Sequence, residues 1–167
     1  MNAKQIISLL RLKPLPVEGG YYRETFRSDE GVAKDGLPGR YEKEKLLYSA
    51  IYYLITPESW SSLHRLPTDE VFHFYLGDPV EMLQLFPDGT GKVELLGNQL
   101  LKAQRPQLCV PRFTWQGTKL AEGGNFALLG TTMAPGFEPS DFLAADTEAL
   151  RKAYPEWKKW IDHYDKA

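Results

Sequence analysis

Short apolar and aromatic runs, separated by turn residues, fill the middle of this 167-residue chain. The turns recur about every 8–12 positions and no helical pattern intervenes, which predicts a sandwich or barrel of short strands. We place this barrel within residues 18–133. The expected strands are Tyr21–Arg27, Leu46–Ile55, Trp60–His64, Glu70–Leu76, Val80–Phe86, Lys92–Leu96, Gln107–Val110, Thr114–Leu120 and Phe126–Thr132.

The remaining segments follow other patterns. Residues 3–12 carry apolar side chains at helical spacing and predict a short amphipathic helix. Residues 140–165 predict a helical tail, with Ser140 as the N-cap of a helix over Asp141–Tyr154. Trp157 and Trp160 in this tail are expected to dock onto the barrel. The polar stretch Ser28–Lys45 is expected to be a mobile loop or a lid.

Composition narrows the class of protein. With 20 Lys and Arg against 22 Asp and Glu, the net charge is −2, and no basic stripe suits nucleic acid. No apolar stretch is long enough to span a bilayer, and the N-terminal run is too broken for a signal peptide. We therefore expect a single cytoplasmic domain over residues 1–167. The only cysteine, Cys109, excludes an intramolecular disulfide and is expected to be a buried small hydrophobe.

The strongest chemical signal lies between His64 and Gly77. Strand alternation would turn Glu70, Phe72 and Phe74 into the barrel and His73 outward. A buried acid beside aromatic rings needs a partner, and His64 is the natural one. The two side chains can form an acid–base pair, ligate a metal, or simply stabilise the barrel mouth through a hydrogen bond.

This segment resembles the first motif of the cupin superfamily. His64 matches the first histidine of that motif, Glu70 its glutamate and Gly77 its glycine, whereas Leu66 stands where a second histidine belongs. The second cupin motif is matched by Pro111 but departs from the pattern at Phe113, in place of glycine, and at Gln116, in place of histidine.

More closely, the chain is similar to the Cupin_5 family of small RmlC-like cupins, a domain of unknown function. The phrases that carry this resemblance are Glu18–Thr25, His64–Tyr75, Gln104–Gln107 with Val110-Pro111 and Trp115-Gln116, and Ala134–Phe137 with Asp141-Phe142. The resemblance implies an all-β double-stranded β-helix, or jelly roll, with a short N-terminal helix and a helical C-terminal tail. It also implies a homodimer, and it assigns no reaction.

The two positions at which this chain lacks a cupin histidine, Leu66 and Gln116, bear on metal binding. A cupin metal site uses three histidines and one glutamate, but here Leu66 offers no ligand and Gln116 is a weak neutral one. No cofactor is firmly implied, and Leu66 and Gln116 disfavour a divalent metal, which would have to rely on His64, Glu70 and Gln116.

The function expected from these features is binding of a small polar or anionic, carbohydrate-like metabolite in the barrel. By analogy with RmlC-like epimerases, His64 is the candidate base of a metal-independent isomerase or epimerase, and Glu70 its orienting carboxylate. The candidate ligand-binding residues are Arg23, Tyr22, Phe72, Gln116 and His73. Two alternatives stay open: a metal-dependent cupin enzyme, such as a dioxygenase or isomerase, and a non-catalytic sensor or binding module.

Overall fold

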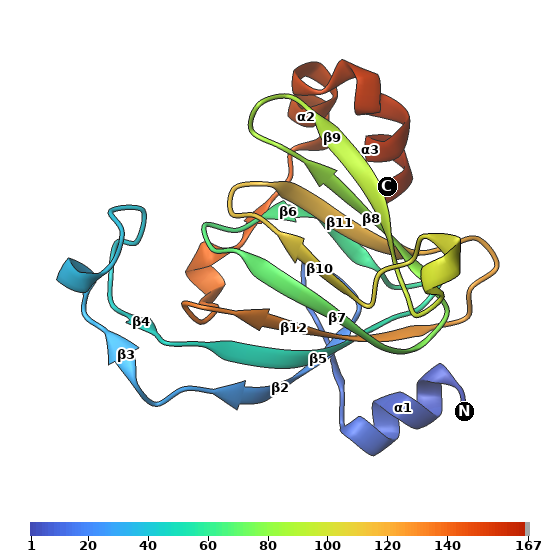
Figure 1. Cartoon of the computed structure of the whole chain (residues 1–167), viewed down its shortest axis with the longest axis horizontal. Helices are drawn as coiled ribbons and strands as arrows, with labels where there is room; N and C mark the ends of the chain where they lie inside the picture. The colour runs from blue at the N-terminus through green and yellow to red at the C-terminus, as the bar shows by residue number, and fades with distance from the viewer. Residues whose placement is uncertain (166–167) are drawn as a thin grey trace.

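Two antiparallel sheets face each other and form the body of the molecule, which we describe from a computed structural model over residues 1–165 (Figure 1). The larger sheet has the order β1-β2-β5-β12-β7-β10 and the smaller one β13-β6-β11-β8-β9. In chain order these strands are β1 (Lys13–Pro14), β2 (Tyr21–Arg27), β5 (Ser49–Ile55), β6 (Ser61–Arg65), β7 (Glu70–Gly77), β8 (Val80–Leu85), β9 (Gly91–Leu96), β10 (Gln107–Val110), β11 (Trp115–Leu120), β12 (Ala127–Met133) and β13 (Leu143–Ala144). The predicted jelly roll is confirmed.

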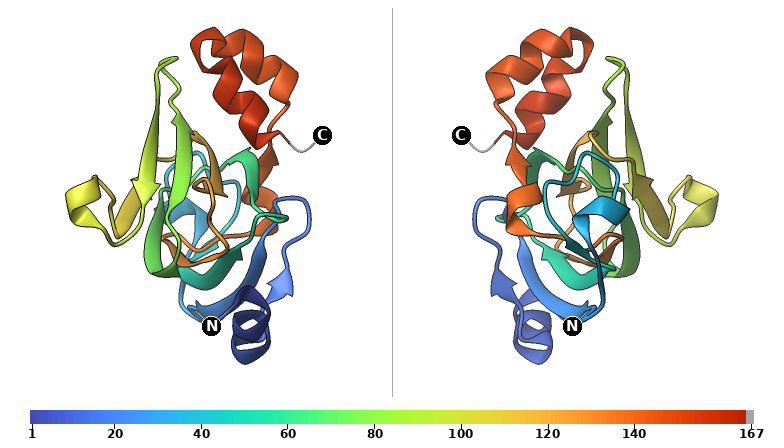
Figure 2. Two further views of the ribbon diagram at one scale, coloured as in Figure 1. Left: turned by 90° about the vertical axis from the view of Figure 1, so that its right-hand side faces the viewer. Right: turned by 90° about the vertical axis from the view of Figure 1, so that its left-hand side faces the viewer.

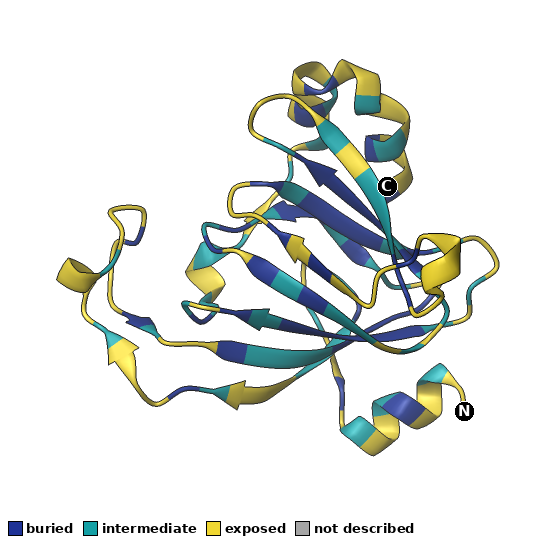
Figure 3. Cartoon of the chain, viewed as in Figure 1, coloured by how far each residue is buried: buried dark blue, intermediate teal, exposed yellow. Residues whose placement is uncertain are grey.

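The main core lies between the two sheets and follows the period of two expected for strands. Tyr53, Phe72 and Leu129 project from the larger sheet and meet Met82 and Leu120 of the smaller sheet. Figure 3 shows buried residues concentrated on the facing strands. Glu70 and Phe72 point inward, as alternation predicts, and Phe74 packs against the same core. Cys109 differs from expectation, because β10 is an edge strand and turns this side chain to its exposed face.

Two short helices cover the outer face of the smaller sheet, at the top of the molecule in both views of Figure 2. They are α2 (Thr147–Ala153) and α3 (Lys158–Tyr164), joined by the 3₁₀ turn η4 (Pro155–Trp157). Trp157 and Trp160 pack in this layer, which confirms their docking role. The predicted helix start at Ser140 is wrong. Ser140 lies in the 3₁₀ turn η3 (Pro139–Asp141), and Asp146 caps α2 instead.

Helix α1 (Ala3–Leu10) covers one end of the outer face of the larger sheet. Its start is fixed by a capping box in which Asn2 and Gln5 exchange side-chain-to-backbone hydrogen bonds of 3.0 and 2.9 Å. Ile6 is fully buried against Leu54 and Leu128. The helix is shorter than the predicted span of residues 3–12, since Arg11 takes a left-handed conformation and ends it.

The stretch Ser28–Lys45 is an ordered arm rather than a structureless loop. It contains β3 (Gly31–Val32), paired with β4 (Lys45–Leu46), and the 3₁₀ turn η1 (Lys34–Gly36). Lys45 is buried and forms an ion pair with Asp141 of η3, which ties the base of the arm to the barrel. Another 3₁₀ turn, η2 (Leu100–Lys102), lies on the opposite side of the molecule from the arm (Figure 1). Among residues 1–165, no helix combines the length and apolar character needed to cross a membrane.

Candidate functional site

A cavity of about 470 Å³ opens between the two sheets at the end where β6 and β7 meet. Its walls are mainly apolar and are contributed by both sheets and by the segment around η3. The apolar lining residues are Leu15, Pro16, Val17, Tyr22, Ala50, Ile51, Tyr53, Leu66, Phe72, Met133, Phe137, Pro139 and Phe142. Polar chemistry is confined to a few side chains, which are Glu18, Glu24, Arg27, Ser49, His64, Glu70 and Thr131. This composition is typical of a small-molecule site.

His64 lies on β6, lines the cavity and is buried to 2% exposure. Its Nδ1 lies 2.8 Å from the carbonyl oxygen of Ser62, and its ring stacks on Phe142 with a centroid distance of 4.9 Å. A carbonyl oxygen only accepts, so Nδ1 carries a proton, and in the neutral imidazole the lone pair belongs to Nε2. Nε2 has no hydrogen-bond partner in the described part of the chain. The imidazole is thus oriented as a base or acceptor.

Glu70 begins β7 and lines the same cavity, but it does not contact His64 within ion-pair distance. Its Oε2 accepts a 2.7 Å hydrogen bond from Nε2 of Gln116 on β11. Burial raises the pKa of Glu70, and the nearby Glu18 carboxylate raises it further, while His64 and the hydrogen bonds from Gln116 and Thr131 act in the opposite direction. The predicted role of Glu70 as the orienting carboxylate of His64 is therefore wrong, because the Ser62 carbonyl holds that place.

Glu18 and Tyr53 are site residues that sequence reasoning missed. Oε1 of Glu18 accepts a 2.9 Å hydrogen bond from Ser61 on β6, and the Tyr53 hydroxyl donates to the carbonyl of Gly19 at 2.8 Å. Burial and the Glu18 carboxylate raise the pKa of Tyr53 well above its ordinary value. The glycines after Glu18 were the available signal. A Cβ on Gly20 would lie 2.7 Å from the Tyr53 ring, so this turn has to be glycine for the two residues to meet.

Arg27 lies at the mouth of the cavity, held there by acidic neighbours. Its guanidinium donates to Glu24 at 2.9 and 2.7 Å, to Glu138 at 3.0 Å and to the Phe137 carbonyl at 3.0 Å. The Glu24 carboxylate raises the pKa of Arg27. With all these bonds made, the guanidinium is engaged by protein acids before any ligand arrives.

A β-bulge explains why Arg27, and not Arg23, reaches the cavity. The pairing of β2 with β5 shifts between Glu24 and Phe26, which leaves Thr25 as the extra residue. Regular alternation would place Arg23 and Arg27 on one face of β2, but the bulge puts them on opposite faces. Arg23 lies on the outer face, with its guanidinium 5.3 Å from the centre of the Tyr52 ring.

The other predicted ligand-binding residues divide between the cavity, its surroundings and the outer face. Tyr22 and Phe72 line the cavity. Gln116 lies beside it, buried, and reaches it only through Glu70. His73 is misplaced in the prediction, because it projects from the outer face of β7, where Nδ1 lies 3.2 Å from Nε2 of Gln107. The parity of β7 forbids His73 from sharing a face with Glu70.

The donors present do not fit a cupin metal centre. Leu66 lines the cavity wall at the place of the second histidine, and Gln116 turns its amide nitrogen, which cannot ligate, toward Glu70. Within residues 1–165, no group of three or more His, Cys, Asp or Glu side chains is arranged to hold a metal ion. His64 and Glu70 alone leave most of a transition-metal coordination sphere without protein ligands.

Comparison with known families and structures agrees with this architecture. The family described as Cupin_5, Cupin superfamily (DUF985), matches residues 4–145. The chain belongs to the Cupin_5 family. The match includes the cavity residues from Glu18 to Phe142 and ends before helix α2.

Several proteins are similar to this chain in sequence or in structure. A hypothetical protein from Leishmania major is 29% identical, covers 100% of both chains and superposes with a TM-score of 0.89. The uncharacterized protein YML079W of Saccharomyces cerevisiae is 28% identical over 149 residues, which are 83% of this chain and 74% of the yeast protein. A cupin 2 conserved barrel domain protein from Rhodopseudomonas palustris, at 13% identity, shares the fold with a TM-score of 0.60 over 93% of this chain and 90% of its own.

Proposed function

We propose that this Cupin_5 protein binds a small, neutral, hydroxyl-rich molecule of carbohydrate type in the barrel cavity, with His64 as its base. The proposal rests on the hydrogen bonding of the His64 ring. Its Nδ1 donates to the Ser62 carbonyl, so in the neutral ring the Nε2 lone pair is left for the cavity, which three carboxylates also line.

The charges of the cavity favour a neutral ligand over the anionic one also considered from the sequence. Glu18, Glu24 and Glu70 line it, and Arg27 is already bonded to Glu24. An anion would meet repulsion from the acids and find no free arginine, whereas hydroxyl groups can donate to carboxylates. The apolar walls suit the carbon–hydrogen faces of a sugar ring.

The cavity also supports isomerase or epimerase chemistry without a metal. The lone pair of His64 Nε2 can remove a proton from a carbon beside a carbonyl group of the ligand. Glu70, whose pKa is raised, can hold a proton at a pH where an exposed carboxyl has lost it, and it can return that proton as an acid. His64 and Glu70 would then act as a base and an acid in one site.

The experiment measures binding and proton exchange separately. Thermal-shift screening of the full chain with neutral sugars, sugar phosphates and carboxylates identifies a probe, and calorimetry gives its affinity. NMR then follows exchange of the ring protons of that probe into deuterated water. We expect neutral sugars to stabilise the protein most, and His64→Gln to abolish exchange.

A matched control is His163→Gln, which removes an exposed histidine on α3 far from the lining residues. It should leave exchange unchanged. If His64→Gln exchanges as fast as the parent, His64 is not the base. If a probe binds in the cavity but never exchanges, the protein is a non-catalytic binding module. Binding confined to anions would contradict the proposed ligand class.

We also propose a homodimer built on the uncovered outer face of the larger sheet, and a cytoplasmic location. Tyr75 is half exposed there, packs edge-on against Tyr52 at 5.9 Å and is stacked near His73 at 6.5 Å. Aromatic residues of this kind are enriched at protein interfaces. Light scattering should report a dimer, and Tyr75→Arg should convert it to a monomer. A parent chain that is monomeric at high concentration would refute the dimer.

A further inference from the structure

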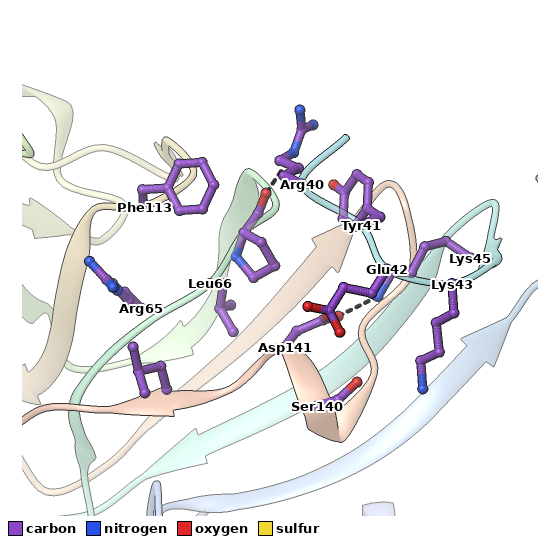
Figure 4. A pocket seen from close by; sticks show the side chains of 12 residues that line it. Arg40, Tyr41, Glu42, Lys43, Lys45, Arg65, Leu66, Phe113, Ser140 and Asp141 are labelled. Atoms are coloured by element: carbon purple, nitrogen blue, oxygen red, sulfur yellow. Dashed lines mark hydrogen bonds and ion pairs between the residues drawn. The ribbon is translucent and has the colours of Figure 1, made fainter. Parts of the chain in front are cut away.

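A second hollow, of about 560 Å³, lies on the outside of the barrel between the arm and the β6–β7 turn (Figure 4). It is separated from the barrel cavity by the segment around η3, and Leu66 lines both. Its walls come from four places in the chain: residues 40–45 of the arm, Arg65–Pro67, Phe113 and residues 140–143. We call it the outer groove.

Basic side chains outnumber acidic ones in the outer groove, whereas acidic side chains outnumber basic ones in the barrel cavity. Four cationic side chains and two acidic ones line it, in a chain whose net charge is −2. Asp141 is already neutralised by its ion pair with Lys45. In Figure 4, this pair and Glu42 lie to one side of the Leu66–Pro67 turn, whereas Arg65 and Phe113 lie on the other. Arg40 lies on the side with Glu42, but among residues 1–165 neither Arg40 nor Arg65 forms an ion pair with an acidic side chain, so each guanidinium can bind an oxyanion.

Both arginines of the groove are oriented by contacts that leave donors free. Nε of Arg40 donates to the Pro67 carbonyl at 2.9 Å, and its guanidinium lies 4.7 Å from the centre of the Tyr41 ring. The Arg65 guanidinium lies 4.8 Å from the centre of the Trp115 ring. Since stacking and the single bond from Nε leave terminal nitrogens unused, these side chains are prepared to bind a phosphate or carboxylate.

Phe113 contributes an aromatic ring to the groove, and its backbone adopts an energetically unfavourable conformation. Its φ is +63°, in the left-handed region that a bulky residue rarely adopts, and its ring is 39% exposed. The backbone is held there by a 2.7 Å hydrogen bond from the Phe113 amide to the Leu66 carbonyl. Glycine would fit this position without strain, and an exposed ring is of little use to the core. Strain that the fold maintains around an exposed aromatic ring points to a binding role.

We propose that the outer groove binds a flat-ringed molecule carrying a phosphate, of the nucleoside monophosphate class. Arg40 takes the phosphate, and the ring packs on Phe113, since Arg40 Nε and the Phe113 amide bind the adjacent carbonyls of Pro67 and Leu66. This site is distinct from the barrel cavity, and it does not depend on the function proposed for that cavity.

The test is calorimetric titration of the full chain with adenosine 5′-monophosphate, and separately with adenosine and with inorganic phosphate. We expect the monophosphate to bind at least tenfold tighter than either fragment. Arg40→Gln should weaken it about tenfold or more. Phe113→Gly should weaken it to a similar extent while keeping or raising the melting temperature, because glycine relieves the backbone strain.

Arg112→Gln is the matched control. This arginine neighbours Phe113 in sequence, is exposed and faces Asp69, but it does not line the groove. It should leave the affinity unchanged, as should His64→Gln in the barrel cavity. The proposal is overturned if the monophosphate does not bind, if phosphate alone binds as tightly, or if Arg40→Gln and Phe113→Gly bind like the parent.

Discussion

Replacing Glu70 with glutamine should make the protein more stable at neutral pH. Glu70 is almost fully buried at 7% exposure, lies near a second carboxylate, Glu18, and has no cationic partner within ion-pair distance in the described chain. The hydrogen bonds from Gln116 and Thr131 only partly offset its desolvation. Glutamine has the same shape and can keep the bond from Gln116 through its carbonyl oxygen, so the substitution removes the charge and little else.

The pH dependence of this effect follows from the difference in proton affinity of Glu70 between the folded and unfolded chains. The folded-state pKa of Glu70 is raised above its ordinary value of 4.5, so the folded protein binds this proton more tightly than the unfolded chain does. Stability associated with this group is therefore greatest below pH 4.5, falls as the pH rises toward the folded-state pKa, and is constant above it. A tenfold difference in proton affinity between the folded and unfolded chains corresponds to about 1.4 kcal/mol.

The assay is urea unfolding of parent and Glu70→Gln between pH 4 and pH 8. We expect Glu70→Gln to be more stable by on the order of 1 kcal/mol or more at pH 8, with the difference shrinking toward pH 4. Glu58→Gln, in the exposed turn before β6, is the matched control and should change little at any pH. A difference independent of pH, or a less stable Glu70→Gln at pH 8, would refute the reasoning.

Three further predictions test the packing and pairing of the fold, each by urea unfolding at pH 7. Gly77→Ala should cost about 2 kcal/mol or more, because φ is +103° and the new Cβ would lie 2.3 Å from the Phe126 carbonyl oxygen. Ile161→Ala should cost about 2–5 kcal/mol, since Ile161 is fully buried between α3 and the smaller sheet. Lys45→Met should cost about 3–5 kcal/mol by leaving Asp141 unpaired, and Lys45→Met with Asp141→Leu should recover much of that loss. Near-zero effects would refute each argument.

The barrel was predictable because its signal is local. Strand β2 has the predicted bounds of Tyr21–Arg27, and β10 those of Gln107–Val110, since alternating side chains and flanking turn residues mark them. Glu70 and Phe72 face inward for the same reason. What a strand buries follows from its own sequence as long as its pairing is regular.

The sequence-based predictions fail where the local conformation depends on residues far away in the chain. Ser140 and Asp141 carry a good helix-start pattern, yet the ion pair from Lys45 and the pairing of β13 with β6 hold that segment in another conformation. The bulge at Thr25 depends on the partner strand β5, and it alone decides that Arg27 reaches the cavity. No local pattern in β2 distinguishes this from a regular strand.

Sequence alone could predict the main residues of the candidate site but not their hydrogen-bond partners. His64 and Glu70 could be found because strand residues have fixed directions, but the partners that set their chemistry, the Ser62 carbonyl and Gln116, are chosen by tertiary contacts. Glu18 comes from a turn, where direction is set by backbone conformations that a residue pattern does not specify.

The barrel cavity keeps polar groups in an arrangement that folding alone does not favour. The Glu18 carboxylate raises the energy of the charged form of Glu70, and His64 Nε2 lies at the cavity without a hydrogen-bond partner among residues 1–165. Apolar side chains of similar volume would serve the core better. A ligand that donates to Glu70 and to Nε2 would compensate the buried charge and the lone pair at once, which is why the arrangement is better explained by binding than by stability.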